Sequence, residues 1–205
     1  MAGFFVSIEG VEGVGKSSNH AFVCDYYRSR GFEVVATREP GGTPEAEKIR
    51  QVLLDAANSL QPLTETLLMF ASRCEHVRTV IEPALAAGKV VVSDRFVDVS
   101  YAYQGGARQL GTGIIAQLDE MVVAGTQPDL TLLLDLDIDA GMARLDKRGA
   151  RDRIELEEKD FFNSARETYL ERAALHPDRF RIIDAAADLA EVQSKIARTL
   201  DAFHP

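Results

Sequence analysis

The sequence predicts an α/β fold, a five-stranded parallel sheet with helices on both faces, because apolar strand-like segments alternate with helical ones along the chain. The apolar runs are nearly continuous, as in strands that are buried on both faces. A glycine-rich loop directly follows the first run, and no segment rich in Pro, Gly or Ser marks a domain boundary. We therefore expect one domain over residues 1–205.

Hydrophobic periodicity predicts the individual elements. Strands are expected at 4–8, 33–37, 89–93, 130–135 and 179–183. Helices are expected near 16–30, 44–57, 63–87, 112–125, 138–148, 158–175 and 188–202. Because ligands of such sheets bind beyond the carboxyl ends of the strands, the residues that follow each strand are the candidates for function.

Composition limits the classes of function. The net charge of −9 argues against a nonspecific nucleic-acid-binding protein, which needs a broad basic surface. Cys24 and Cys74 lack metal-ligand spacing, and Met1 is not followed by a basic segment and a long apolar one. No apolar run approaches the roughly 20 residues of a membrane-spanning helix. We expect a cytoplasmic protein without nucleic-acid or membrane partners.

The first strand leads into Gly10-x-x-x-x-Gly15-Lys16-Ser17, a phosphate-binding loop that precedes a helix. Gly10 and Gly15 allow the backbone to approach an anion, so that its N–H groups and the helix dipole meet phosphate oxygens. Lys16 can reach the β- and γ-phosphates of a nucleoside triphosphate, and the Ser17 hydroxyl suits Mg²⁺. The strand and helix on either side favour this interpretation over an incidental glycine-rich turn.

The second and third strands end in charged residues. Arg38 and Glu39 precede Pro-Gly-Gly at 40–42, a rigid turn that would hold them at the crevice rim, although a plain connector with solvated charges is the alternative. The third strand ends in Asp94 and Arg95. A carboxylate that faces the phosphate loop can hold Mg²⁺ or its waters, and the guanidinium can clamp a second phosphate. A structural ion pair is the alternative.

Two further segments carry polar candidates. Residues 100–106, SYAYQGG, are expected to be flexible and to suit reading a base edge and packing on a sugar, although a tyrosine there could also belong to the core. In the helix at 63–87, Met69, Arg73 and His76 lie beside the apolar stripe. Arg73 could point into the crevice or be exposed, and we expect His76 to be structural or solvated. The stripe expected to face the core comprises Leu67, Phe70, Cys74, Val77, Ile81 and Leu85.

The fourth strand and its helix lead into a basic run. Five basic residues occupy ten positions, at Arg144, Lys147, Arg148, Arg151 and Arg153. Such a run is usually a solvated face. Here Gly149 interrupts the helix, and the basic residues are concentrated in an acidic protein. We therefore expect a mobile lid, at about 148–158, that brings arginines onto phosphate.

Seven segments together resemble the bacterial thymidylate kinases, from Phe4 to about Ile196. They are IEGVEGVGKSS at 8–18, TREPGGT at 37–43, SDRF at 93–96, AYQGGAR at 102–108, PDLTLLLD at 128–135, RGARDRIE at 148–155 and DFFNSARETYL at 160–170. The resemblance implies a P-loop kinase fold with strand order 2-3-1-4-5. It also implies a homodimer that transfers the γ-phosphate of ATP to dTMP, with Mg²⁺, giving ADP and the dTDP needed for dTTP synthesis.

The resemblance assigns roles to matching positions. ATP would contact Gly10, Val11, Glu12, Gly13, Val14, Gly15, Lys16, Ser17, Ser18 and Arg144. The acceptor dTMP would contact Glu12, Arg38, Met69, Phe70, Arg73, Arg95, Ser100, Tyr103 and Gln104. Glu12 would meet its sugar or the metal shell, and Tyr103 would crowd the 2′ position. Lys16, Arg95 and Arg153 would be catalytic, with Arg148 and Arg151 as weaker candidates, and Ser17 and Asp94 would bind the metal.

Two positions depart from the family pattern. Relatives usually have an aromatic residue four positions before Arg73, where this chain has Met69. Either the polarizable thioether of Met69 packs on the base, or the helix shifts to bring Phe70 in. At position 99 relatives commonly have a hydroxyl residue, whereas this chain has Val99.

Two other classes of function are disfavoured. A nucleotide-dependent switch is disfavoured because no Asn-Lys-x-Asp segment is present. A kinase for another monophosphate or for a deoxynucleoside is disfavoured by the resemblance alone.

Overall fold

The structure, a computed structural model, describes residues 3–146, 149 and 151–203. Its centre is a parallel sheet of five strands in the order β2-β3-β1-β4-β5. The strands are β1 (Phe4–Glu9), β2 (Val34–Arg38), β3 (Val90–Asp94), β4 (Leu130–Asp135) and β5 (Phe180–Asp184). Both the expected fold class and the strand order 2-3-1-4-5 are confirmed.

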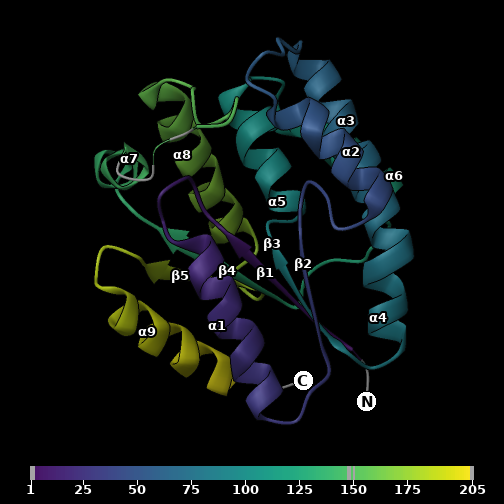
Figure 1. Cartoon of the computed structure of the whole chain (residues 1–205), viewed down its shortest axis with the longest axis vertical. Coiled ribbons are helices and arrows are strands. Elements are labelled where there is room, and N and C mark those ends of the chain that lie inside the picture. Colours follow the sequence, from purple (N-terminus) through teal and green to yellow (C-terminus); the bar gives the residue numbers. More distant parts are fainter. Residues whose placement is uncertain (1–2, 147–148, 150, 204–205) are drawn as a thin grey trace.

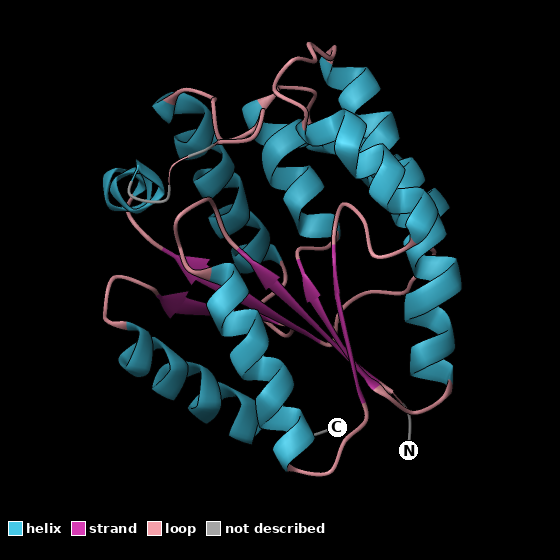
Figure 2. Cartoon of the chain, viewed as in Figure 1, coloured by secondary structure: helices cyan, strands magenta, loops and turns pink. Residues whose placement is uncertain are grey.

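Alternate residues of the central strands enter different parts of the core. Phe5 and Val91 belong to one buried cluster, whereas Val6 and Val92 belong to the other. Because successive side chains of a strand point to opposite faces, both faces of the sheet must be covered. Figure 2 shows the strands running through the middle of the molecule with helices around them.

The helices divide between the two faces. On one side α1 and α9 pack together, and on the other α3, α4 and α6 are grouped (Figure 1). Among the described residues, no helix combines the length and apolar character needed to cross a membrane. The helical segments are α1 (Lys16–Ser29), α2 (Pro44–Leu54), α3 (Pro62–His76), the π-helical η1 (Val77–Ile81), α4 (Glu82–Ala86), α5 (Val97–Ser100), the π-helical η2 (Tyr101–Ala107), α6 (Thr112–Val122), α7 (Ile138–Asp146), α8 (Lys159–Leu175) and α9 (Leu189–Ala202).

The core-facing stripe expected for the helix at 63–87 is wrong in part. Leu67 is 51% exposed and Cys74 is also exposed, whereas the polar Arg73 and His76 are buried. Arg73 and His76 both contact the buried carboxylate of Glu39. Because a buried partner compensates for their desolvation, these polar residues occupy inner positions that an apolar pattern assigns elsewhere.

The expectation that residues 100–106 are flexible is also wrong. They form the end of α5 and most of η2, and Tyr101, Tyr103 and Gln104 are buried. The glycines here allow close packing, because a Cβ atom on Gly106 would lie 2.1 Å from Thr168 Oγ1 of α8. A side chain would therefore push α8 away from η2.

Candidate active site

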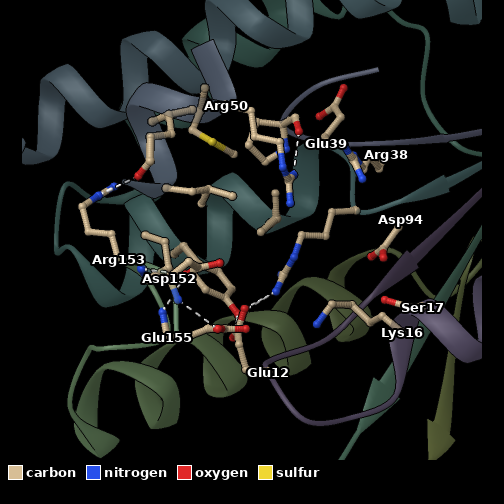
Figure 3. A pocket seen from close by; sticks show the side chains of 18 of the residues that line it. Glu12, Lys16, Ser17, Arg38, Glu39, Arg50, Asp94, Asp152, Arg153 and Glu155 are labelled. Carbon is tan, nitrogen blue, oxygen red and sulfur yellow. Dashed lines mark hydrogen bonds and ion pairs between the residues drawn. The ribbon is translucent and has the colours of Figure 1, made fainter. Parts of the chain in front are cut away.

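The ends of β1, β2 and β3 open onto one cavity of about 380 Å³. The phosphate loop forms one wall, and α2, α3 and η2 form another. Residues 152–155 and the start of the 38–40 turn complete it (Figure 3). The cavity therefore lies at the sheet edge where the sequence predicted chemistry.

The phosphate loop turns tightly before α1. Gly13 has φ 76°, and a Cβ atom there would lie 2.2 Å from the carbonyl oxygen of Gly141. Lys16 Nζ donates to the carbonyl oxygens of Gly10 at 3.0 Å and Val11 at 2.7 Å. Burial, reinforced by the nearby Arg95, lowers the pKa of Lys16 to about 8. The ammonium group thus lies over the loop, where a phosphate would find it.

Arg95 reaches the loop from the end of β3. It has φ 70°, which is uncommon for a residue with a side chain. Its guanidinium donates to the Gly10 carbonyl oxygen at 3.2 Å, lies over the Tyr103 ring and pairs with Glu12. Burial raises the pKa of the Glu12 carboxyl, but Arg95 and Lys16 outweigh it, so the pKa is lowered. Tyr103 also donates to Glu12. Five expected site residues are thereby brought together, namely Gly10, Glu12, Lys16, Arg95 and Tyr103.

Glu9, which the sequence reasoning missed, supports the turn that carries Arg95. Glu9 Oε1 accepts the backbone N–H of Phe96 at 2.7 Å, and Oε2 accepts the hydroxyl of Tyr169 at 2.7 Å. Burial, together with Asp98, raises the pKa of Glu9 to about 8. The only sequence signal was a carboxylate at the end of a buried strand.

Arg73 lies behind the cavity wall. It donates to Glu39 Oε2 at 2.7 Å, Ser100 Oγ at 3.0 Å and the Phe96 carbonyl oxygen at 3.1 Å. Arg73 is 1% exposed, so the exposed alternative is wrong, and neither it nor Ser100 lines the cavity. Burial raises the pKa of Glu39, but Arg73 and His76 lower it more. His76 is therefore a structural residue.

The other acceptor candidates lie at different depths. Met69, Tyr103 and Gln104 line the cavity, whereas Phe70 does not. Gln104 is buried, and its Oε1 atom has no hydrogen-bond partner among the described residues. Arg38 lines the rim and pairs with Glu47 at 3.0 Å, so it is held at the crevice edge as expected.

Ser17 and Asp94 are the metal candidates, and both line the cavity. In the described part of the chain, no group of three or more His, Cys, Asp or Glu side chains could hold a metal ion. A hydroxyl and a carboxylate beside a phosphate loop fit Mg²⁺, which keeps several waters and takes its remaining ligands from phosphate.

Some residues of the basic run at 144–153 line the cavity and others do not. Arg153 is 8% exposed and lines the cavity, where it bonds Leu53 and Glu65. Arg144 also lines the cavity and donates to the Ala185 carbonyl oxygen at 3.1 Å. Arg151 pairs with Asp146 and does not line the cavity. Arg148 lies outside the described residues. The sequence did not point to Glu65, because a single acidic residue on a helix gives no sign that it will be buried at a site.

A model of the thymidylate kinase family matches residues 8–196. The chain belongs to the thymidylate kinase family. It is 55% identical over 202 residues to the thymidylate kinase of Chromohalobacter salexigens, which covers 97% of this chain and 95% of that protein. It is 51% identical to the thymidylate kinase of Pseudomonas fluorescens, over 96% of this chain and 94% of that one.

A solved structure shares the architecture. The crystal structure of thymidylate kinase from Ehrlichia chaffeensis matches with a TM-score of 0.81 at 28% identity, over 98% of this chain and 100% of that chain. The thymidylate kinase resemblance inferred from the sequence motifs is thus confirmed over almost the whole chain.

Proposed function

We propose that this member of the thymidylate kinase family transfers the γ-phosphate of ATP to dTMP, giving dTDP and ADP for dTTP synthesis. One observation carries the proposal: Lys16 of the phosphate loop and Arg95 of β3 lie at the same cavity, whose opposite wall contains Met69 and Gln104. A donor phosphate and an acceptor nucleotide would therefore meet between two cations.

The donor half is the phosphate loop. Residues 10–18 would surround the ATP phosphates with backbone N–H groups at the start of α1, and Lys16 would contact the β- and γ-phosphates. Arg144, whose guanidinium lies within 3.5 Å of the Gly13 carbonyl oxygen, would lie near the adenine. Ser17 and Asp94 would hold Mg²⁺, which would neutralise charge on the phosphates.

The acceptor half begins at Arg95, which would hold the dTMP phosphate, with Glu12 at the sugar or in the metal shell. Tyr103 would crowd the 2′ position, and Arg38 would stay at the rim. Met69 would pack on thymine, and the unpartnered Oε1 of Gln104 would accept an N–H of the base. Arg73 and Ser100, which bond each other at 3.0 Å, would contribute to the base site from behind the wall.

The chemistry requires positioning rather than a general base, because the attacking phosphate is already ionised. Lys16, Arg95 and Arg153 would neutralise charge on the transferred group as the donor and acceptor oxygens align. Residues 148–158 would form a lid that closes to exclude water, which would otherwise be a competing acceptor.

We further propose a single cytoplasmic domain that forms a homodimer. Cys24 and Cys74 are free, which suits a reducing compartment. On adjacent helices, Leu67 of α3 is 51% exposed and Met121 of α6 is 69% exposed. A second copy of this chain would cover them. Sedimentation of the wild type should give a dimer, and Leu67→Glu should shift it toward monomer. A monomeric wild type would refute this part.

An ADP-release assay across dTMP, dUMP, UMP, CMP, AMP and GMP tests the main proposal. We expect the highest kcat/KM with dTMP and loss of activity when EDTA removes Mg²⁺. Clear preference for any other monophosphate would overturn the assignment of the acceptor. ADP release that does not depend on any acceptor would indicate an ATPase instead.

A further inference from the structure

Glu65 of α3 accepts hydrogen bonds from three side chains, two at residues 104–108 and one in the basic run. Its side chain is 1% exposed, and its carboxylate accepts Gln104 Nε2 at 2.8 Å, Arg108 Nη2 at 3.2 Å and Arg153 Nη2 at 2.7 Å. Burial raises the pKa of Glu65, but Gln104, Arg108 and Arg153 outweigh it and lower the pKa. An ionised carboxylate of the cavity wall therefore holds Arg153 of the basic run.

Arg153 is turned away from the phosphate loop. Its Nε donates to the Leu53 carbonyl oxygen at 2.7 Å, and its backbone N–H donates to the Leu54 carbonyl oxygen at 3.1 Å. Figure 3 shows Arg153 across the cavity from Lys16 and Ser17. In this arrangement the guanidinium bonds Leu53 and Glu65 on the far side of the cavity from the loop.

The same segment presents carboxylates to the cavity instead. Asp152 and Glu155 both line it (Figure 3). Asp152 Oδ1 accepts the backbone N–H groups of Ile154 and Glu155, which closes a compact turn. Burial raises the pKa of Asp152, and the neighbouring Glu155 and Glu12 add to the shift. This segment therefore contributes two acidic residues and Arg153 to the lining of the cavity, and the guanidinium of Arg153 is engaged by Leu53 and Glu65.

Arg153 can leave Glu65 without leaving the buried Glu65 carboxylate unpaired. Arg108 bonds both Glu65 and Glu157, the latter at 2.6 Å, and Gln104 supplies a third donor. Removing the only partner of a buried carboxylate is strongly destabilising, but Glu65 keeps a guanidinium after Arg153 departs. Arg153 is thus the exchangeable member of the cluster, and Arg108 is the permanent one.

We propose that Glu65 is a positioning residue that holds Arg153 on the α2–α3 side of the cavity and releases it when a nucleoside triphosphate offers a stronger anionic partner. This rests on the proposed function, because ATP is the ligand that draws Arg153 away. Holding Arg153 lowers the population of the ATP-competent state and so weakens the apparent affinity for ATP. Weakening the contact between Glu65 and Arg153 should therefore increase the affinity for ATP. If Glu65 were only structural, the same change would not increase it.

The test is calorimetric titration of the full chain with Mg²⁺ and a non-hydrolysable ATP analogue, AMP-PNP, without acceptor. Glu65→Gln should bind the analogue about 3- to 10-fold more tightly than the wild type. In an Arg153→Ala background, Glu65→Gln should produce no gain. Glu82→Gln is the matched control, because it removes a carboxylate that pairs with Arg78 and does not line the cavity, and its affinity should equal that of the wild type.

Unchanged or weaker AMP-PNP binding by Glu65→Gln would overturn the proposal, as would a gain that persists without Arg153. Thermal melting checks that the variants are folded. If Glu65→Gln does not fold, hydrogen exchange on the wild type tests whether Arg153 is released when AMP-PNP binds. The Arg153 amide, which bonds the Leu54 carbonyl oxygen, should exchange faster when AMP-PNP is bound, and an unchanged rate would refute release.

These readouts separate this inference from the proposed function. Preference for an acceptor other than dTMP in the ADP-release assay would refute the function but leave the AMP-PNP results valid. Confirmed dTMP phosphorylation together with an affinity insensitive to Glu65 would refute the positioning role alone.

Discussion

Met69 and Phe70 are consecutive in α3 but belong to different parts of the core. Met69 lines the cavity and packs in the same cluster as Val99 and Tyr103. Phe70 lies in the other cluster, where its ring centroid is 4.6 Å from the Arg73 guanidinium carbon. Successive helix positions point about 100° apart, so only one of the two can face the cavity. The helix brings Met69, and not Phe70, to the proposed thymine site.

We predict that Met69→Ala weakens dTMP binding more than Phe70→Leu does. Loss of a buried methionine contact should raise the Kd for dTMP roughly 10- to 100-fold, in line with about 1.5–3 kcal/mol for such a side chain. Phe70→Leu should mainly lower the free energy of unfolding. Calorimetric titration and urea denaturation measure the two effects. The opposite order of dTMP affinities would assign the base contact to Phe70.

Arg153→Ala should lower kcat by roughly 10³-fold or more with little change in dTMP affinity, by analogy with arginine fingers. Arg151→Ala is the comparison variant. Arg151 pairs with Asp146 and does not line the cavity, so its replacement should lower kcat less than Arg153→Ala does. Steady-state kinetics with both substrates measures the effect. A near-normal kcat for Arg153→Ala would remove Arg153 from the catalytic role.

ATP affinity should decline as pH rises through about 8, the pKa to which burial and Arg95 lower Lys16. Above that pH the amine is neutral and no longer attracts phosphate. The Kd for AMP-PNP between pH 6.5 and 9 measures this in the free enzyme. Lys16→Ala should bind more weakly, with little pH dependence in this range. A variant that keeps the wild-type profile would assign the titration to another group.

Stability should depend on pH through Glu9, whose pKa rises from 4.5 to about 8 on folding, through burial and Asp98. A raised pKa means that the folded state favours the protonated form. The stabilisation is complete below pH 4.5 and is lost as pH rises through about 8.

Glu9→Gln keeps acceptor capacity for the Phe96 N–H but removes this titration. The free energy of unfolding, from urea denaturation at pH 5 and pH 8, should fall less in the variant than in the wild type. Equal differences for the two proteins would show that Glu9 does not titrate in this range.

The fold was predictable because its signals are local. Apolar runs such as Phe4–Ile8, the loop spacing around Lys16 and the residues that end β3 all act over a few neighbouring positions. The helix over 97–107 was not predicted, because its glycines indicate flexibility unless the close approach of Thr168 from α8 is known. Leu67 and Cys74 were assigned to the core because periodicity does not show which polar residues will find buried partners.

The sequence by itself determined the parallel sheet, the phosphate loop and the family, and it named most residues that line the cavity. The tertiary structure decided which partner each charged side chain meets. Arg73 pairs with Glu39, 34 positions away, and Arg153 pairs with Glu65, 88 positions away. The physical reason is that burial makes an unpaired charge prohibitive, so the folded chain selects partners by proximity in space. The spacing of residues along the chain therefore does not predict which charged side chains will pair.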